Sequence, residues 1–233
     1  MSKIELTHAF FDYIDDGIAY NVLNDLDLTV EEGEFVSLIG SSGCGKSTVL
    51  SILSGINTLT KGEFFIDKKL INGPGKDRGI VFQHYSLFPW MTSKKNISFG
   101  LKQINDGMQQ RVAIARTLAL GSDILLMDEP FGAIDAKNKL ILQEFLLEIL
   151  SKEDKKRTVV FVTHDVDEAI LLSDRVLFMY NKKIDQDIRV DFPRPRKREE
   201  FATTTNYKSI RERIMALFFR DVMENIGGNE VVI

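Results

Sequence analysis

The hydrophobic positions of the chain fall into short continuous runs and into longer stretches with helical spacing. Continuous apolar runs occupy residues 35–39, 123–127, 158–162 and 175–179. Runs of this length without alternation are typical of strands that are buried on both faces of a parallel sheet. Helical spacing marks the stretches 108–120, 136–150 and 167–172. Strands that alternate with helices predict an α/β fold, with a ligand site at the carboxyl ends of the strands.

The two ends of the chain and the stretch after residue 60 show weaker patterns. Further strands are predicted at 3–6, 26–30, 61–67, 68–73 and 79–82. The third and fourth of these suggest a hairpin, and residues 31–33 suggest a turn. Near the C-terminus, apolar residues at helical spacing predict a helix over 209–223. This helix could pack on the core, pair with a second copy of the chain, or contact a partner.

Residues 40–47 read Gly-Ser-Ser-Gly-Cys-Gly-Lys-Ser, which is a phosphate-binding loop pattern between a predicted strand and a predicted helix. Glycines let the backbone fold around a polyphosphate, and the free N–H groups at the start of the helix point at the anion. Lys46 is expected to reach the β- and γ-phosphates, and Ser47 to bind Mg²⁺. The sequence therefore predicts that ATP or GTP is bound by Gly40, Ser41, Ser42, Gly43, Cys44, Gly45, Lys46, Ser47 and Thr48.

Composition and charge mainly exclude other classes of protein. The 233 residues suffice for one large domain, or for a domain with a small appendage. A net charge of −4 argues against a nucleic-acid partner. Cys44 is the only cysteine, so no intrachain disulfide can form and a reducing cytosol fits. No apolar stretch is long enough to span a membrane, and no signal peptide pattern is present at the N-terminus.

Polar groups with catalytic chemistry follow two of the predicted buried strands. Asp128 at the end of the run that includes 124–127 can hold Mg²⁺ beside the phosphate loop. The adjacent Glu129 would then face the γ-phosphate and polarise an attacking water. His164 follows the run 158–162 and could reach the same phosphate, although a lone histidine there is more often structural. Gln83 after the strand at 79–82 could be an ordinary surface residue.

These motifs, in this order, resemble those of the ATP-binding cassette ATPases. The matching segments are 40–47 (Walker A), Gln83 (Q-loop), 108–116 (the helix after the signature), 124–129 (Walker B), 131–135 (D-loop) and His164 (switch histidine). The resemblance covers roughly residues 3–198. It implies a P-loop fold with a mixed, mainly parallel sheet flanked by helices and an N-terminal antiparallel β part. An ATPase domain is then expected at 1–198 and a helical tail at 199–233.

The resemblance also implies a role for each motif residue. Glu129 would be the base that orients water, His164 would bind the γ-phosphate, and Gln83 would sense the metal, which makes these three the catalytic set. The implied Mg²⁺ ligands are Ser47, Gln83 and Asp128. Asp135 would communicate across the interface of a dimer. The cofactors implied are ATP and Mg²⁺.

One aromatic residue near the N-terminus is expected to stack on adenine. By position, Phe10 matches the residue that has this role in the family. Phe11 and Tyr13 are close competitors, and each of the three could instead be a core aromatic.

The chain departs from the family pattern in the segment 93–107. Only 93–103 fills the place of a subdomain of several helices, so much of that helical subdomain is expected to be missing. The family's signature aligns with 104–107, and the residues expected to face the partner's ATP are Asn105, Asp106, Gly107 and Met108. A carboxylate at Asp106 would repel the γ-phosphate by ~4 kcal/mol at 4 Å with an effective dielectric near 20. Alternatively, Asn105 or Asp106 caps the following helix and leaves its positive end available.

Within the family the chain resembles the nitrate/sulfonate/taurine importer branch. The stretches that carry this resemblance are 73–83, 87–92 and 192–196. It implies an ATP-hydrolysing subunit at the cytoplasmic face of the cell membrane, which works as a homodimer or with a paired ATPase subunit. Its partners would be transmembrane permease subunits and, indirectly, a solute-binding protein. The alternative is a nucleotide-binding but hydrolysis-defective regulatory or vestigial paralogue, which the short 93–103 segment and Asp106 would explain.

Overall fold

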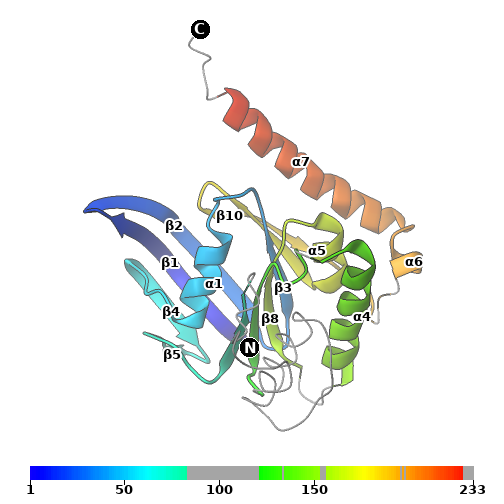
Figure 1. The fold of residues 1–233 in the computed structure, drawn as a ribbon, viewed down its shortest axis with the longest axis horizontal. Helices are drawn as coiled ribbons and strands as arrows, with labels where there is room; N and C mark the ends of the chain where they lie inside the picture. Colours follow the sequence, from blue (N-terminus) through cyan, green and yellow to red (C-terminus); the bar gives the residue numbers. More distant parts are fainter. Residues whose placement is uncertain (83–120, 133, 153–155, 195, 197, 228–233) are drawn as a thin grey trace.

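The computed structural model describes residues 1–82, 121–132, 134–152, 156–194, 196 and 198–227 (Figure 1). Its centre is a six-stranded sheet in the order β10-β9-β3-β8-β7-β6. The strands are β3 (Phe35–Ile39), β6 (Arg78–Val81), β7 (Ile124–Asp128), β8 (Thr158–Val162), β9 (Arg175–Tyr180) and β10 (Lys183–Arg189). The first five run parallel to one another, and only β10 is antiparallel to its neighbour β9. The predicted buried strands and the mixed, mainly parallel sheet are confirmed.

A second, antiparallel sheet in the order β2-β1-β4-β5 lies beside the first. Its strands are β1 (Ser2–Asp15), β2 (Ile18–Glu31), β4 (Lys61–Ile66) and β5 (Lys69–Leu70). The expected hairpin is β4–β5, but the short strands expected at 3–6 and 26–30 are wrong in extent. They are parts of one long hairpin. Register shifts interrupt the pairing, and positive φ angles at His8 and Asp25 mark bulges that break the alternation of apolar residues.

Helices cover both faces of the central sheet (Figure 1). One side carries α1 (Lys46–Ser54) and the antiparallel sheet, and the other carries α4 (Ala136–Lys152) and α5 (Val166–Leu172). The last described elements are α6 (Arg198–Phe201) and α7 (Thr205–Gly227). The predicted helices at 136–150, 167–172 and 209–223 correspond to α4, α5 and α7. The helix predicted at 108–120 lies outside the described residues.

The strands of the central sheet divide their side chains between two hydrophobic cores. Val36 and Leu38 of β3 join the cluster with α1 and the antiparallel sheet, whereas Phe35 and Ile39 join the cluster with α4 and α5. Because both faces are buried, every position of such a strand can be apolar. The C-terminal helix joins the second cluster through Tyr207, Ile210 and Ile214. Of the three expectations for this helix, packing on the core is the one observed.

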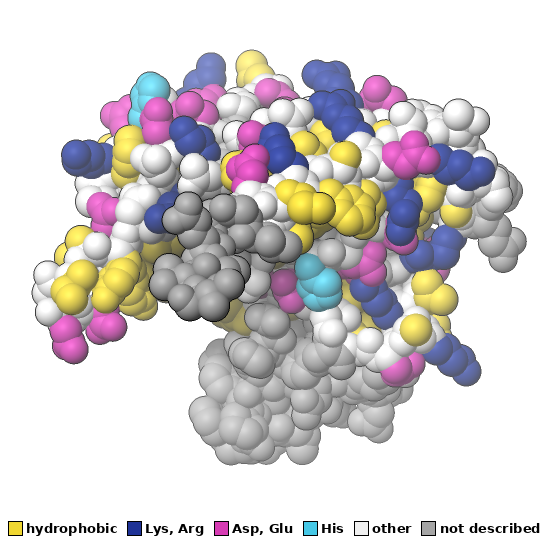
Figure 2. Space-filling model, turned by 90° about the horizontal axis from the view of Figure 1, so that it is seen from above, with side chains coloured by type: hydrophobic (Ala, Val, Ile, Leu, Met, Phe, Trp, Pro, Cys, Tyr) yellow, Lys and Arg dark blue, Asp and Glu magenta, His cyan; other side chains and the backbone are white. Residues whose placement is uncertain are grey.

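The described surface carries both signs of charge. In the view of Figure 2, basic and acidic side chains are interspersed over the described part of this face. None of the described helices is long and apolar enough to cross a membrane.

Candidate functional site

The phosphate loop leaves the carboxyl end of β3 and leads directly into α1. Two positions of this loop require glycine, because neighbouring atoms lie too close to the backbone there for a side chain. A Cβ atom at Gly40 would lie 2.4 Å from the Met179 carbonyl oxygen, and one at Gly45 would lie 2.8 Å from Leu23 Cδ2. Both residues also have positive φ angles, of 152° and 106°. The loop is therefore locked between β9 and β2, and it presents the start of α1 at the edge of the sheet.

Lys46 is the first residue of α1 and holds the loop from inside. Its side chain is 8% exposed, and Nζ donates to the carbonyl oxygens of Gly40 and Ser41 at 2.8 and 2.7 Å. Cys44 lies 3.7 Å away from Nζ and is buried, which raises the pKa of its thiol. A neutral, buried thiol fits the expected small filler of a tight turn. The ammonium group is thus the charge that an incoming polyphosphate would meet.

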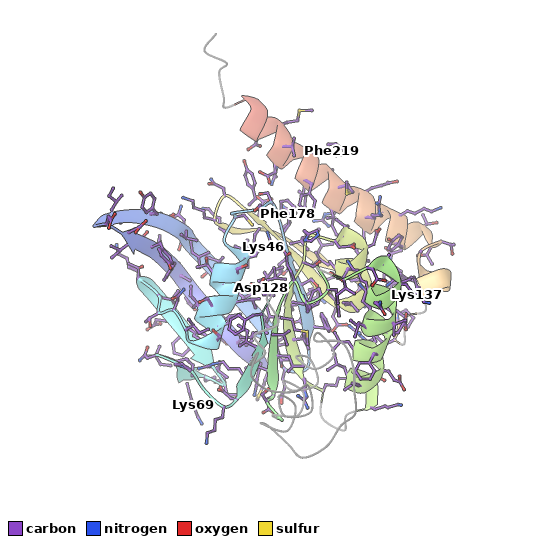
Figure 3. The ribbon with its side chains drawn as sticks, viewed as in Figure 1. Lys46, Lys69, Asp128, Lys137, Phe178 and Phe219 are labelled. Atoms are coloured by element: carbon purple, nitrogen blue, oxygen red, sulfur yellow. The ribbon has the colours of Figure 1, made fainter. Side chains whose placement is uncertain are left out.

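Asp128 is the last residue of β7 and lies near the phosphate loop. Figure 3 shows it close to Lys46. Ser47 Oγ donates to Asp128 Oδ1 at 3.2 Å. Burial raises the pKa of Asp128, and the negative charge of Glu129 adds to this, while Ser47 and Lys46 oppose it. A divalent cation would relieve the cost of this buried carboxylate. Hydroxyl and carboxylate oxygens are also the ligands that Mg²⁺ takes together with phosphates, so the residues fit the predicted metal.

Glu129 and His164 meet at the ends of β7 and β8. Glu129 Oε2 lies 3.3 Å from His164 Nδ1. The backbone N–H of Glu129 donates to the Val162 carbonyl at 3.0 Å, and Glu129 takes a positive φ of 42°. A bulky residue in the left-handed region is strained, and such strain is common at functional sites. The structure thus joins the two predicted catalytic side chains, one from each strand.

Asp135 lies just before α4 and caps that helix. Its carboxylate accepts from Asn138 N at 3.1 Å and from Asn138 Nδ2 at 2.7 Å. These bonds lower the pKa of Asp135, so it stays ionised. The exposed carboxylate remains a candidate for contact with a second subunit.

The three aromatic candidates for adenine occupy different environments on β1. Phe11 is buried, pairs across the hairpin with Leu23, and contacts Tyr13 edge-on at 6.1 Å. Since Leu23 in turn packs against Gly45, Phe11 connects to the phosphate loop. Tyr13 is exposed and Phe10 is half-buried, with its carbonyl bound to Thr60 N. Stacking of Phe10 on adenine stays a prediction. Tyr13 remains a competitor for this role, because its ring is exposed and is held by the edge-on contact with the buried Phe11.

Several predicted site residues lie outside the described residues. These are Gln83, Asn105, Asp106, Gly107 and Met108, together with the segments 87–92 and 93–103.

Sequence reasoning missed a buried polar cluster behind His164. Glu168, Gln143 and Thr163 are buried, and Glu168 accepts a hydrogen bond from each of the other two. One signal was present, because Asp165 and Glu168 form the capping-box spacing of a helix start. Asp165 does cap α5, accepting from Glu168 N at 3.0 Å.

Together the fold and the site define a nucleotide-binding protein of the phosphate-loop α/β class. A protein-family model described as ABC transporter matches residues 23–103 and 92–132. An uncharacterized ABC transporter ATP-binding protein of Methanocaldococcus jannaschii is 39% identical over 257 residues, which covers 96% of this chain and 93% of that protein. The chain therefore belongs to the ABC transporter family of ATP-binding proteins, and it is an ATPase of that family.

Two relatives from Synechococcus elongatus carry more specific names. The bicarbonate transport ATP-binding protein CmpC is 42% identical and the nitrate import ATP-binding protein NrtC is 40% identical. These matches cover 85% and 91% of this chain but 35% and 37% of those longer proteins.

A solved structure supports the fold class independently. The chain matches an ATP-binding cassette in a dimeric post-hydrolysis state bound to ADP and Pi, with a TM-score of 0.71 and 28% identity. The match covers 82% of this chain and 100% of that one. The predicted family and fold are confirmed, and the hydrolysis-defective alternative gains no support.

Proposed function

We propose that this chain is the ATP-hydrolysing subunit of a membrane importer for a small solute. The observation that carries the proposal is the convergence of a cation, oxygen ligands and a carboxylate–imidazole pair at one edge of the sheet, from Lys46, Ser47, Asp128, Glu129 and His164. Transfer of a phosphoryl group to water requires this combination of charges. The similarity to nitrate and bicarbonate transport ATPases supports the importer part.

ATP binding would keep the backbone conformation of the phosphate loop and change the partners of Lys46. The amides of the loop and of the first turn of α1 would hold the phosphate oxygens. Lys46 Nζ would exchange its two loop carbonyls for the β- and γ-phosphates, gaining charge-assisted hydrogen bonds. Ser47, Asp128 and Gln83 would hold Mg²⁺. That ion, when bound, would supply positive charge that offsets the negative charge of the phosphates.

Hydrolysis would be attack of water on the γ-phosphorus, with the ADP oxygen leaving on the opposite side. Glu129 would orient this water and accept its proton. His164 would hydrogen-bond the γ-phosphate from the other side. Its contact with Glu129 would keep the carboxylate aimed at the water.

The same proposal includes a second ATPase subunit and separate membrane subunits. The matched cassette is a dimer, which supports pairing of this chain with a second copy or with a paired subunit. Each ATP would then lie between the phosphate loop of one chain and residues 105–108 of the other, with Asp135 contacting the partner. Permease subunits would carry the solute, and a solute-binding protein would deliver it. The chain would therefore work as a peripheral protein at the cytoplasmic face of the membrane.

The transported solute is proposed to be a small anion of the nitrate, sulfonate or taurine kind. The names of the two Synechococcus relatives support a small anion of this size. Specificity would reside in the permease and the binding protein, so uptake assays with the co-purified membrane subunits identify the solute.

A shortened helical subdomain at 93–107 is also proposed. The family model matches in two segments that overlap at 92–103, where the shortening is expected. The alignment with the Methanocaldococcus relative extends over 257 positions, more than the 233 residues of this chain, so that relative has residues without a counterpart here.

The proposed function is tested by turnover of Mg-ATP at increasing protein concentration. If the active form is a dimer, turnover per chain should rise with protein concentration, because each site needs a second subunit. Lys46→Ala should abolish ATP binding and turnover. Lys69→Ala is the matched control, because Lys69 is exposed on β5, away from the site (Figure 3). Tight ATP binding with negligible turnover in the unaltered chain would instead favour the hydrolysis-defective reading.

A further inference from the structure

Glu168 is a buried acid that lies behind the catalytic edge of the sheet. It belongs to the first turn of α5 and is 3% exposed. A carboxylate loses much of its hydration there, and burial raises its pKa. Such a group is costly unless its oxygens are satisfied. Its presence therefore calls for an account beyond helix formation.

Both carboxylate oxygens of Glu168 are bound by side chains. Oε2 accepts a hydrogen bond from Thr163 Oγ1. Oε1 accepts from Gln143 Nε2 at 2.6 Å and lies 3.4 Å from Lys139 Nζ. Two of these partners come from α4, and the third comes from the loop that carries His164. Glu168 thus joins α4 to the loop.

The contacts differ from an ordinary helix cap. In a capping box, the acid at this position would reach back to the N–H of Asp165. Here that N–H donates to Thr163 Oγ1 at 3.0 Å, which frees Glu168 to bind elsewhere. Asp165 closes a ring of hydrogen bonds with Thr163 and Glu168, because its carboxylate accepts from Glu168 N at 3.0 Å. The same carboxylate accepts from Lys139 Nζ at 2.8 Å.

His164 lies between the two residues that this ring holds. Thr163 precedes it and Asp165 follows it, and both are hydrogen-bonded within the ring. The His164 side chain itself is largely exposed, and its Nδ1 lies 3.3 Å from Glu129 Oε2. The position of His164 is therefore set by the hydrogen bonds of Thr163 and Asp165, and not by side chains packed around its imidazole group.

The ring also extends to the C-terminal segment. Arg198 of α6 donates from Nη2 to Gln143 Oε1. The amide of Gln143 is thus satisfied at both ends, which fixes its orientation toward Glu168.

We propose that Glu168 is a positioning residue for His164, which it holds against Glu129 by tying Thr163 to helix α4. The inference rests on the proposed catalytic role of His164. Loss of the Glu168 contacts would let His164 shift relative to the γ-phosphate, and a misplacement of about 1 Å costs up to ~100-fold in rate. The phosphate loop is on another strand, so ATP binding would be preserved.

The test compares Glu168→Gln in two backgrounds, with radiolabelled ATP to follow slow variants. In the otherwise unaltered chain, kcat should fall about tenfold or more, while the Kd of ATP stays within about twofold. In a His164→Ala background, the same substitution should lower kcat by less than about twofold, because coupled residues are non-additive. Glu148→Gln is the control, since that α4 carboxylate is exposed and pairs with Lys152.

Three results would overturn the inference. These are an unchanged kcat in Glu168→Gln, equal losses in both backgrounds, or an increase in Kd that matches the fall in kcat. Should Glu168→Gln fail to fold, Thr163→Val carries the same expectations, because it removes the hydroxyl at the other end of the contact. An unaltered chain without turnover would contradict the proposed function itself, and the role of His164 with it.

Discussion

Two acids at the start of α5, the N-cap Asp165 and Glu168 of the first turn, experience opposite electrostatic environments. Glu168 is buried, and its pKa is raised by that burial. Burial alone would also raise the pKa of Asp165, but the hydrogen bonds from Lys139 Nζ and from Glu168 N lower it overall. The difference arises because Asp165 both caps the helix and faces an ammonium group. At the scale of single residues, Asp165 therefore stabilises the folded chain as a charged group.

The charge of Asp165 should give a measurable dependence of stability on pH. Because its folded-state pKa lies below the unfolded value, its contribution is present above the unfolded pKa and is lost as pH falls through the folded pKa. Asp165→Asn keeps a capping oxygen but removes the charge. We expect it to lower the free energy of unfolding at pH 7 by about 0.5–1 kcal/mol, allowing for partial exposure.

Urea denaturation of both chains between pH 7 and pH 3 checks this expectation. The difference between them should shrink toward the acid end. A difference that grows as the pH falls would contradict the assigned direction of the pKa shift.

Residues with local motifs could be predicted from the sequence, and residues with distant partners could not. Lys46 and Ser47 follow from one loop pattern, and Asp128 and Glu129 follow from the end of one apolar run. The pairing of Gln143 with Glu168 joins residues that are 25 positions apart on different helices. Only the packing of α4 against α5 creates that contact, so the sequence carried no signal for it beyond the capping pattern.

At the scale of elements, α7 is fixed to the domain by one face. Phe218 packs edge-on against Phe178 at 5.1 Å, and Ile214 has no exposed surface. Polar contacts add to this, since Arg211 Nε and the Tyr207 hydroxyl both donate to Asp167 of α5. The helix therefore braces α5 through Asp167, the residue next to the Glu168 that contacts α4.

A cavity in this interface should destabilise the chain. Ile214→Ala is expected to lower the free energy of unfolding by about 2–4 kcal/mol, because it removes a fully buried side chain. Phe219→Ala is the matched control on the same helix, since Phe219 is 63% exposed (Figure 3); its effect should stay within about 0.5 kcal/mol. Urea denaturation followed by circular dichroism measures both. Equal losses would contradict the packing of α7 described here.

The regular elements were predictable where burial produces a simple pattern. The strands β3, β7, β8 and β9 were found because both of their faces are covered. The hairpin β1–β2 was underestimated because bulges at His8 and Asp25 shift the alternation. The helix α7 extends beyond the expected 209–223 at both ends, and at its N-terminal end it includes the buried Tyr207.

At the scale of the whole molecule, three separate parts of the sequence supply one reaction site. The loop after β3 supplies the phosphate-binding groups, the end of β7 supplies the two acids, and the end of β8 supplies the histidine. A parallel sheet places these three ends at one edge, which is why order along the chain was enough to predict their convergence. Two hydrophobic cores on either side keep that edge rigid.

The measurement that bears most directly on this site is the comparison of Glu129→Gln with the unaltered chain. The substitution keeps the shape of the side chain but removes the base that orients water. ATP binding followed by calorimetry should be retained, while steady-state Mg-ATP hydrolysis should fall by at least about 100-fold. Hydrolysis at the unaltered rate in Glu129→Gln would contradict the assignment of this edge of the sheet as the place where ATP is cleaved.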